Sequence, residues 1–145
     1  MDWGRAVNKI RCIPMYFLRL SGHSSTYFSG MSEELEDRFL QFALEARKLC
    51  FLLQNHTINH EYCRQLLRSS SSVGANYIEA SDSLGKADET MKLKIARREA
   101  KESCFWLRLV YIPETTPDIE TKRAILLEEA QQIKKKLSAI LLKRG

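Results

Sequence analysis

QLLRSSSSVGANYIEA, residues 65–80, is the stretch of sequence that decides the fold. Its apolar and small residues recur at steps of three and four, which is the period of one face of an α-helix. Gly74 stands in the middle, and the residues around it carry little side-chain bulk. A neighbouring helix can therefore come close to this segment, and that close approach is the expected reason for a glycine of low helix propensity.

Three further amphipathic segments accompany this helix, and the sequence predicts an all-α fold, an antiparallel up-and-down four-helix bundle over residues 31–145. Gly85 suits the end of the second helix, and Thr116 with Pro117 suits the start of the fourth. The inner positions expected for the four helices are Leu35, Phe39, Phe42, Ala46, Leu49 and Leu53; Cys63, Leu66, Ser70, Val73, Tyr77, Ala80 and Leu84; Met91, Ile95, Ala96, Ala100, Ser103, Cys104, Leu107, Val110 and Tyr111; and Ile119, Leu126, Ala130, Ile133, Leu137 and Ile140.

Residues 1–30 show no sustained period and are rich in serine and glycine near their end, so they are predicted to form a flexible lead-in. The folded part is expected to begin at Met31. The chain has a formal net charge of +5. Four basic residues and one acid precede Met31, which leaves 19 basic and 17 acidic residues in the predicted bundle. Any basic surface must therefore come from the distribution of charge.

The four cysteines, Cys12, Cys50, Cys63 and Cys104, are far apart and lack the close pairs of zinc or redox motifs. The last three fall on apolar helix positions, so we expect reduced thiols packed in the core. Reduced thiols predict a cytoplasmic protein. No apolar run approaches the roughly 20 residues of a membrane span, and no secretory signal is evident.

The run from Gln65 to Ala80 resembles a signature of a four-helix-bundle family that includes proteins encoded by intervening sequences of 23S ribosomal RNA genes. The shared pattern is an arginine, small residues, a Ser-Val pair, and Asn76 followed by Glu79 and an alanine. A second similar stretch is IARREA at 95–100, followed by Glu102, Trp106 and Leu107. This chain departs from the pattern in its four serines and in Tyr77.

The resemblance implies a homopentamer of four-helix bundles. Relatives of the family include the accessory protein of diversity-generating retroelements, which binds nucleic acid and a reverse transcriptase. The implied partners are therefore a second copy of this chain, RNA or DNA, and a protein such as a reverse transcriptase. The residues that match the family motif are expected to have structural roles: Arg68, Gly74, Asn76, Glu79 and Glu102.

Arg68 and Glu79 are three turns apart on one helix, so each is expected to pair with a neighbouring helix, where Arg97, Arg98 and Glu102 are candidates. A catalytic role for Glu79 with Glu102 is the less favoured alternative, because no histidine accompanies them. The four serines could bind phosphate, but hydroxyls within a helix more often bond to the preceding turn.

The sequence offers little enzymatic machinery. The Glu-x-x-His pairs of di-iron bundles and Gly-rich phosphate loops are both missing. His56 and His60 are four residues apart but lie at an expected turn, and a solvated turn is the preferred interpretation over a metal site. We therefore expect a non-enzymatic protein without a metal or cofactor.

A basic surface is the remaining candidate for function. Four residues of the third helix recur at spacings of three, four and seven, and three lysines follow one another in the fourth. These could contact phosphates without reading sequence. The alternative is that Glu99, Glu102, Glu128 and Glu129 pair with them, leaving a protein-interaction scaffold that binds no nucleic acid. The candidate nucleic-acid-binding residues are Lys94, Arg97, Lys101, Arg108, Lys134, Lys135 and Lys136.

Several large apolar residues fall outside the inner positions and would widen the apolar faces of the helices beyond the needs of one bundle. Surplus surface of this kind favours self-association. These residues are Leu40, Leu44, Phe51, Leu52, Leu93, Phe105 and Trp106.

Overall fold

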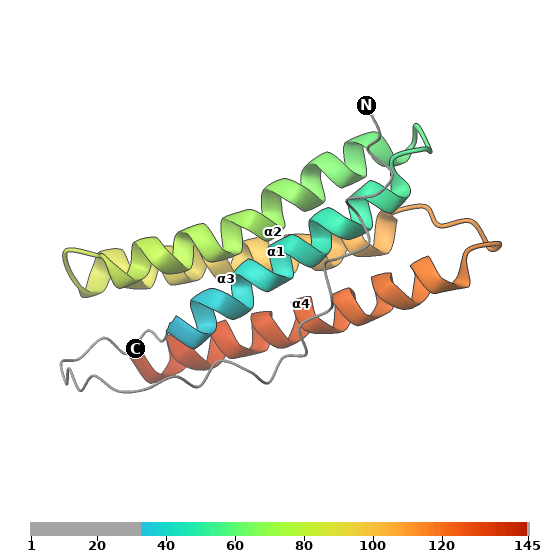
Figure 1. The fold of residues 1–145 in the computed structure, drawn as a ribbon. Helices are drawn as coiled ribbons and strands as arrows, with labels where there is room; N and C mark the ends of the chain where they lie inside the picture. Colours follow the sequence, from blue (N-terminus) through green and yellow to red (C-terminus); the bar gives the residue numbers. More distant parts are fainter. Residues whose placement is uncertain (1–32, 145) are drawn as a thin grey trace, which may run out of the picture.

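Four helices lie side by side along one long axis in the computed structural model (Figure 1). The structure describes residues 33–144, which form α1 (Glu33–Leu53), α2 (Asn59–Ser81), α3 (Lys86–Leu109) and α4 (Pro117–Arg144) with no strand among them. None of these helices is long and apolar enough to cross a membrane. The predicted lead-in over 1–30 and the boundary at Met31 lie outside the described residues.

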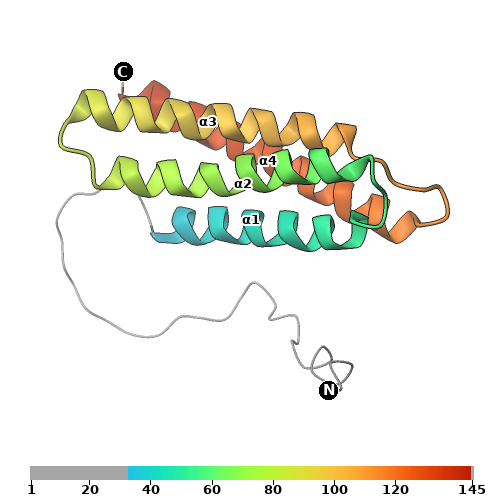
Figure 2. The ribbon, with the colours of Figure 1, turned by 90° about the horizontal axis from the view of Figure 1, so that it is seen from above.

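Each helix packs on the next along the chain, and α1 packs on α4 to close the bundle (Figure 2). The ends that meet are those expected of antiparallel neighbours. The Ser81 hydroxyl at the end of α2 lies 3.4 Å from Glu36 at the start of α1. Arg144, at the end of α4, pairs with Glu89 in the first turn of α3. The predicted all-α four-helix bundle is confirmed.

The core follows the predicted inner positions closely. Phe39 and Tyr77 are fully buried, and their rings meet edge to face at a centroid distance of 4.9 Å. Such a pair contributes roughly 0.5–1.5 kcal/mol beyond its buried area. The other buried apolar residues are Phe42, Ala46, Leu49, Cys50, Leu53, Cys63, Leu66, Val73, Ala80, Leu93, Ala96, Ala100, Cys104, Leu107, Val110, Leu126, Ala130, Ile133 and Leu137.

Two inner positions were wrong because the helices end earlier than predicted. Helix α2 ends at Ser81, so Leu84 lies in the connection to α3, where it is fully exposed. Helix α3 ends at Leu109, and Tyr111 follows in the next connection with a half-exposed side chain. Gly85 therefore precedes α3 instead of capping α2.

The register at the start of α3 also differs from the prediction. Leu93, expected on the surface, is fully buried, whereas Met91 is 55% exposed. Leu93 precedes Ala96 by three residues and Ala100 by seven, so it shares their buried face. Met91 is two residues away, about 200° around the helix, and must point outward. Of the other surplus apolar residues, Leu40, Phe51, Leu52 and Phe105 are exposed, while Leu44 and Trp106 are half-buried.

The three cysteines of the described part are free thiols and all are buried, as predicted. The Cys50 thiol lies 3.8 Å from the carbonyl oxygen of Cys63. The hydrogen bond to Cys63 and burial raise the pKa of Cys50, and burial raises the pKa of Cys104. Protonated, buried thiols are poor nucleophiles, so Cys50 and Cys104 act as small core side chains. Cys12 lies outside the described residues.

Gly74 lies where α2 approaches α1. A Cβ atom added at this position would lie 3.6 Å from the Phe39 Cβ and 3.9 Å from the Phe39 carbonyl carbon. That is ordinary van der Waals contact, so one methyl group fits beside Phe39. The close approach expected from the small residues of α2 is present.

Two substitutions at Gly74 should therefore have opposite effects on stability. Gly74→Ala should raise the free energy of unfolding by up to about 1 kcal/mol, because alanine is the better helix former and its methyl fits. Gly74→Leu should lower it by about 1–3 kcal/mol through overpacking against Phe39. Urea denaturation of both variants measures the difference. A leucine variant as stable as wild type would show that α1 and α2 can move apart at this point without lowering the free energy of unfolding.

Candidate functional site

Four cations line one flank of α3. Lys94, Arg97, Lys101 and Arg108 are all exposed, and none forms an ion pair with another residue of 33–144. Their spacings of three, four and seven keep them on the same side of the helix. The first and last are 14 residues apart, so the line of charge is about 21 Å long.

This flank of α3 faces α4. Arg108 of α3 and Lys134 of α4 both lie close enough to the Cys104 thiol to lower its pKa, although burial has the larger effect and raises it. Arg97 and Lys101 precede Cys104 by seven and three residues and share its side of the helix. We call the five residues Lys94, Arg97, Lys101, Arg108 and Lys134 the cation row.

The three consecutive lysines of α4, all candidate nucleic-acid-binding residues, do not lie on one side of the helix. Lys135 follows Lys134 and is exposed, but Lys136 lies about 200° around the helix from Lys134. Glu129, seven residues before Lys136, pairs with Arg38 of α1 at 2.6 Å. Lys136 therefore lies on the α1 flank of α4, away from the cation row.

Three of the four glutamates that could have neutralised the cation row form ion pairs with other residues. Glu99 and Glu102 bind Arg68 of α2, while Glu129 binds Arg38. Glu128 accepts a hydrogen bond from Gln132 at 2.7 Å. The positive charge of the row is therefore not cancelled by direct pairing within the described part of the chain.

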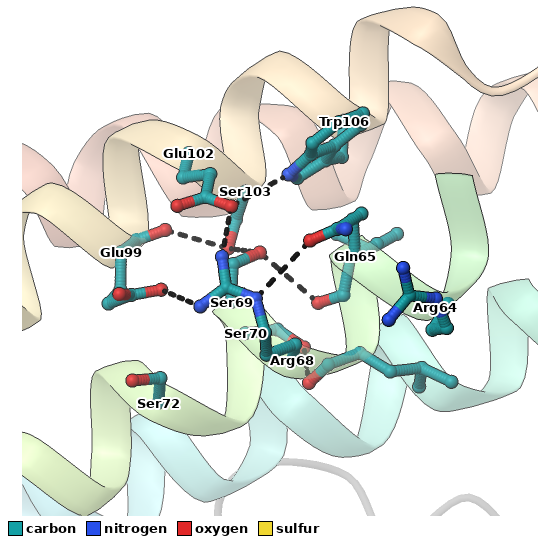
Figure 3. Close-up of polar contacts among 12 residues, drawn as sticks. Arg64, Gln65, Arg68, Ser69, Ser70, Ser72, Glu99, Glu102, Ser103 and Trp106 are labelled. Atoms are coloured by element: carbon teal, nitrogen blue, oxygen red, sulfur yellow. Dashed lines mark hydrogen bonds and ion pairs between the residues drawn. The ribbon is translucent and has the colours of Figure 1, made fainter. Parts of the chain in front are cut away.

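Arg68 links α2 to α3 through two carboxylates (Figure 3). Its guanidinium pairs with Glu102 and lies 3.4 Å from Glu99. Trp106 donates an indole N–H to the same Glu102 at 3.1 Å. Burial alone would raise the pKa of Glu102, but the hydrogen bonds from Trp106 and Arg68 outweigh it and lower that pKa. Glu99 is more buried, and burial raises its pKa.

The serines next to Arg68 serve packing instead of ligand binding. Ser69 and Ser103 are buried, and their hydroxyl oxygens lie 2.9 Å apart where α2 meets α3. Ser69 and Ser71 also donate to carbonyls of the preceding turn, at 3.3 Å and 2.7 Å. Asn76 likewise donates to the carbonyl oxygen of Ser72, at 2.8 Å. Because the hydroxyls of Ser69 and Ser71 donate to these carbonyls, they are not available to bind a phosphate.

Glu79 pairs with Lys92 of α3, and neither Arg97 nor Arg98 reaches it, in contrast to the sequence prediction. Lys92 lies seven residues before Glu99, on the flank of α3 that faces α2, whereas Arg97 lies on the α4 flank. The carboxylates of Glu79 and Glu102 thus belong to separate ion pairs. Their arrangement gives no support to a catalytic pair.

The two histidines of the described residues, His56 and His60, take part in local contacts. His56 meets the ring of Tyr111 edge to face at 5.3 Å, and His60 Nε2 lies 3.1 Å from the carbonyl oxygen of Gln54. Within residues 33–144, no three His, Cys, Asp or Glu side chains gather in a way that could hold a metal ion.

Asn59, which stands between His56 and His60 where the sequence predicts a turn, is a structural residue. It is fully buried at the start of α2, and its amide donates to the carbonyl oxygens of Leu53 at 3.3 Å and Tyr111 at 2.8 Å. Its side-chain oxygen accepts the Tyr111 backbone N–H at 2.8 Å. Asn59 thus ties the α1–α2 turn to the chain that leaves α3. Only its position directly after the polar turn could have suggested this role.

A cleft of about 680 Å³ lies beside the hydrogen bonds between Asn59 and Tyr111, at the end of the bundle where α3 ends. It is lined by the start of α2, the end of α3 with the connection after it, and the first turns of α4. Arg108 belongs to both the cleft and the cation row. No pattern in the sequence indicates the cleft, because its walls come from three separate segments.

Removal of the Arg68 charge should destabilise the bundle in a pH-dependent way. Arg68→Met should lower the free energy of unfolding by about 1 kcal/mol at pH 7. Arg68 favours the ionised carboxylates of Glu99 and Glu102 in the folded state, so its loss raises their folded-state pKa values. That penalty exists while the carboxylates are ionised and disappears as pH falls and they take up protons.

Urea denaturation of wild type and Arg68→Met at pH 7 and pH 4 tests this expectation. The free energies of unfolding of the two proteins should differ at pH 7 and approach one another at pH 4. Arg64→Met is the matched control, since the ion pair of Arg64 among residues 33–144 is with Glu61, on the same exposed helix surface. An equal loss at both pH values would mean that Arg68 acts through packing of its aliphatic stem.

Comparison with known proteins agrees with this architecture. No protein with a curated description matches the chain. The solved structure of a protein of unknown function from the S23 ribosomal protein family of Bacteroides thetaiotaomicron is 32% identical in sequence, with a TM-score of 0.64; the match covers 74% of this chain and 97% of that one. The family model for the 23S rRNA-intervening sequence protein matches residues 34–139, and the chain therefore belongs to that family.

Proposed function

We propose that this protein is a non-enzymatic accessory factor that binds RNA or DNA through the cation row. The observation that carries the proposal is that these five cations lie along the α3–α4 side of the bundle while the nearby carboxylates are held elsewhere. An uncompensated line of cations attracts the phosphate backbone and releases its counterions. The same interactions carry no sequence information, so the expected binding is sequence-independent.

The dimensions of the row suit a nucleic-acid strand. Its length of about 21 Å corresponds to roughly six successive phosphates, taken at about 3.4 Å per residue along a duplex strand. Lys135, exposed beside Lys134, would extend the same charge outward. The three buried thiols fit a reducing cytoplasmic compartment, where nucleic acid is accessible.

Self-association is the second proposed property, and an apolar face on the opposite side of the bundle supports it. Leu40 follows Glu36, which contacts α2, by one turn, and Phe51 lies three turns further along the same side. On α2, Leu67 and Ile78 flank Gly74 on the side that meets α1. We call these four residues the α1–α2 apolar face; their side chains are 38–62% exposed.

Exposed apolar residues in a line across two adjacent helices are typical of an interface. A closed ring of identical subunits would bury such a face repeatedly, and five subunits is the expected number from the family resemblance. A scaffold that binds only proteins, such as a reverse transcriptase, is the alternative function that this face favours. The two functions differ in whether the cation row has a ligand.

Neutralising three residues of the row should weaken binding and its salt dependence. The triple variant Lys94→Gln, Arg97→Gln, Lys101→Gln should bind duplex DNA and structured RNA at least about tenfold more weakly at low salt. The slope of log affinity against log salt should fall by about 2–3, close to one unit for each phosphate that is no longer neutralised. Fluorescence anisotropy titrations at several salt concentrations measure both quantities.

The matched control removes the same charge from elsewhere: Arg47→Gln, Lys122→Gln, Lys136→Gln. These three residues form no ion pair within residues 33–144 and lie away from the row, so their loss should change affinity only slightly. Equal weakening by the two triples would reduce the proposal to a general charge effect. Absence of binding by wild type at low salt would leave the scaffold as the better function.

Self-association should depend on the α1–α2 apolar face. Light scattering coupled to size exclusion should show an oligomer at micromolar concentration, and Phe51→Lys with Ile78→Lys should give a monomer that keeps its helical circular dichroism. The control pair Ile125→Lys with Leu142→Lys changes exposed apolar residues of α4 and should leave the oligomer intact. A monomeric wild type would overturn this part of the proposal.

A further inference from the structure

We infer that the cleft at the end of α3 receives one unpaired nucleobase of a strand whose phosphates follow the cation row. This inference rests on the proposed function and adds the form of nucleic acid that is bound: a strand with an exposed base, in preference to a fully paired duplex. The connection between the two features is Arg108, which lies at the end of the row and lines the cleft.

The walls of the cleft have the composition that a nucleobase needs. Tyr62 comes from α2 and Tyr111 from the connection after α3, and Ile58 and Leu127 add aliphatic surface. Tyr111 and Ile58 are 49% and 57% exposed, respectively, so their apolar surface is open to a ligand. A base can stack on an aromatic ring whatever its identity, which suits a protein that does not read sequence.

The charges of the cleft favour an anionic strand over other occupants. Arg123 is satisfied inside the protein, because it pairs with Glu120 and donates to the carbonyl oxygen of Leu107 at 3.2 Å. Glu120 is correspondingly neutralised, and its pKa is lowered by the hydrogen bonds from Arg123. Arg108 is left as the cation without an ion-pair partner among the described residues. A ligand with a planar apolar part and an adjacent negative charge matches this arrangement.

The cleft is held open by the protein itself. Asn59 fixes the backbone of Tyr111 through both its N–H and its carbonyl oxygen, so the position of this wall does not depend on the Tyr111 side chain. The ring of Tyr62 stacks on Trp106 at a centroid distance of 6.2 Å, which supports the Tyr62 wall of the cleft. A volume of about 680 Å³ lies within the range of small-molecule sites, roughly 300–1,000 Å³, and exceeds what one base requires. A preformed site lowers the entropic cost of binding.

The sequence alone does not indicate the aromatic surface on which a base of a single strand could stack. Tyr62 and Tyr111 are 49 residues apart, and no cluster of aromatic residues marks either position. The bundle brings the start of α2 and the end of α3 to the same end, since the two helices are antiparallel. The cleft is thus a consequence of topology.

Two strands with identical phosphates test the inference. One is a 12-residue thymidine strand, and the other is a 12-residue abasic deoxyribose-phosphate strand that carries no bases. The full-length protein should bind the thymidine strand at least about fivefold more tightly at the same salt concentration, as expected for one stacked base. Both strands should show the same salt dependence, because their phosphates meet the same cations.

Substitutions in the cleft should change the ratio of the affinities for the thymidine strand and the abasic strand, and they should leave the salt dependence of binding unchanged. Tyr111→Ala should bring the ratio of the two affinities close to one, whereas Tyr111→Phe should preserve it, because phenylalanine still stacks. Ile58→Ser is a second variant at an exposed position, so it should fold normally and lower the ratio. The cation-row triple variant should weaken both strands equally and leave the ratio unchanged.

The two ways in which the inference can fail are distinguishable. If neither strand nor duplex binds wild type at low salt, the proposed function and this inference are both overturned. If both strands bind equally, or if Tyr111→Ala and Ile58→Ser leave the preference intact, the row binds phosphates but the cleft does not hold a base. That result would overturn the inference and leave the proposed function standing.

Discussion

The pairing of Arg68 with Glu99 and Glu102 is the constraint on which the rest of the molecule depends. It engages two carboxylates on the α2 side of α3, where Trp106 donates a hydrogen bond to one of them. Because glutamates on α3 are committed there, the basic residues on the α4 flank have no neighbouring acid on their own helix. One interhelical ion-pair cluster thus links α2 to α3 on the side of α3 away from the cation row.

The small side chains of α2 make this pairing possible. Ser69 meets Ser103 at 2.9 Å beneath Arg68, which requires the two helices to approach closely. Bulkier residues would hold the helices apart and move the guanidinium away from its carboxylates. On the other side of α2, Gly74 allows the same approach to Phe39 of α1. The small residues of the 65–80 segment therefore act in packing first, and their effect on charge follows from it.

The sequence predicted the interior better than the ends. Periodicity located nearly every buried residue, because an apolar seam is a local pattern that survives without knowledge of neighbours. It failed for Leu84, where the end of α2 decides which residues are buried, and for Leu93, where the rotation of α3 decides it. Ion-pair partners on neighbouring helices were harder to predict. Glu79 pairs with Lys92 because the rotation of α3 about its axis brings Lys92 to the side that faces α2. Asn59 and the cleft were beyond prediction, since a buried polar side chain and a cavity are defined only once three segments meet.

A modest net charge is compatible with nucleic-acid binding if copies associate through the α1–α2 apolar face. That face lies on two helices, and the cation row lies on the other two, so association would leave each row exposed. A closed ring repeats its rows around one axis at fixed spacing. A strand that binds one row is then held near the next, and several weak interactions combine into substantial affinity without any additional charge per chain. In such an assembly the small excess of basic residues in the bundle matters less than the separation of Glu99 and Glu102 from the cation row around α3.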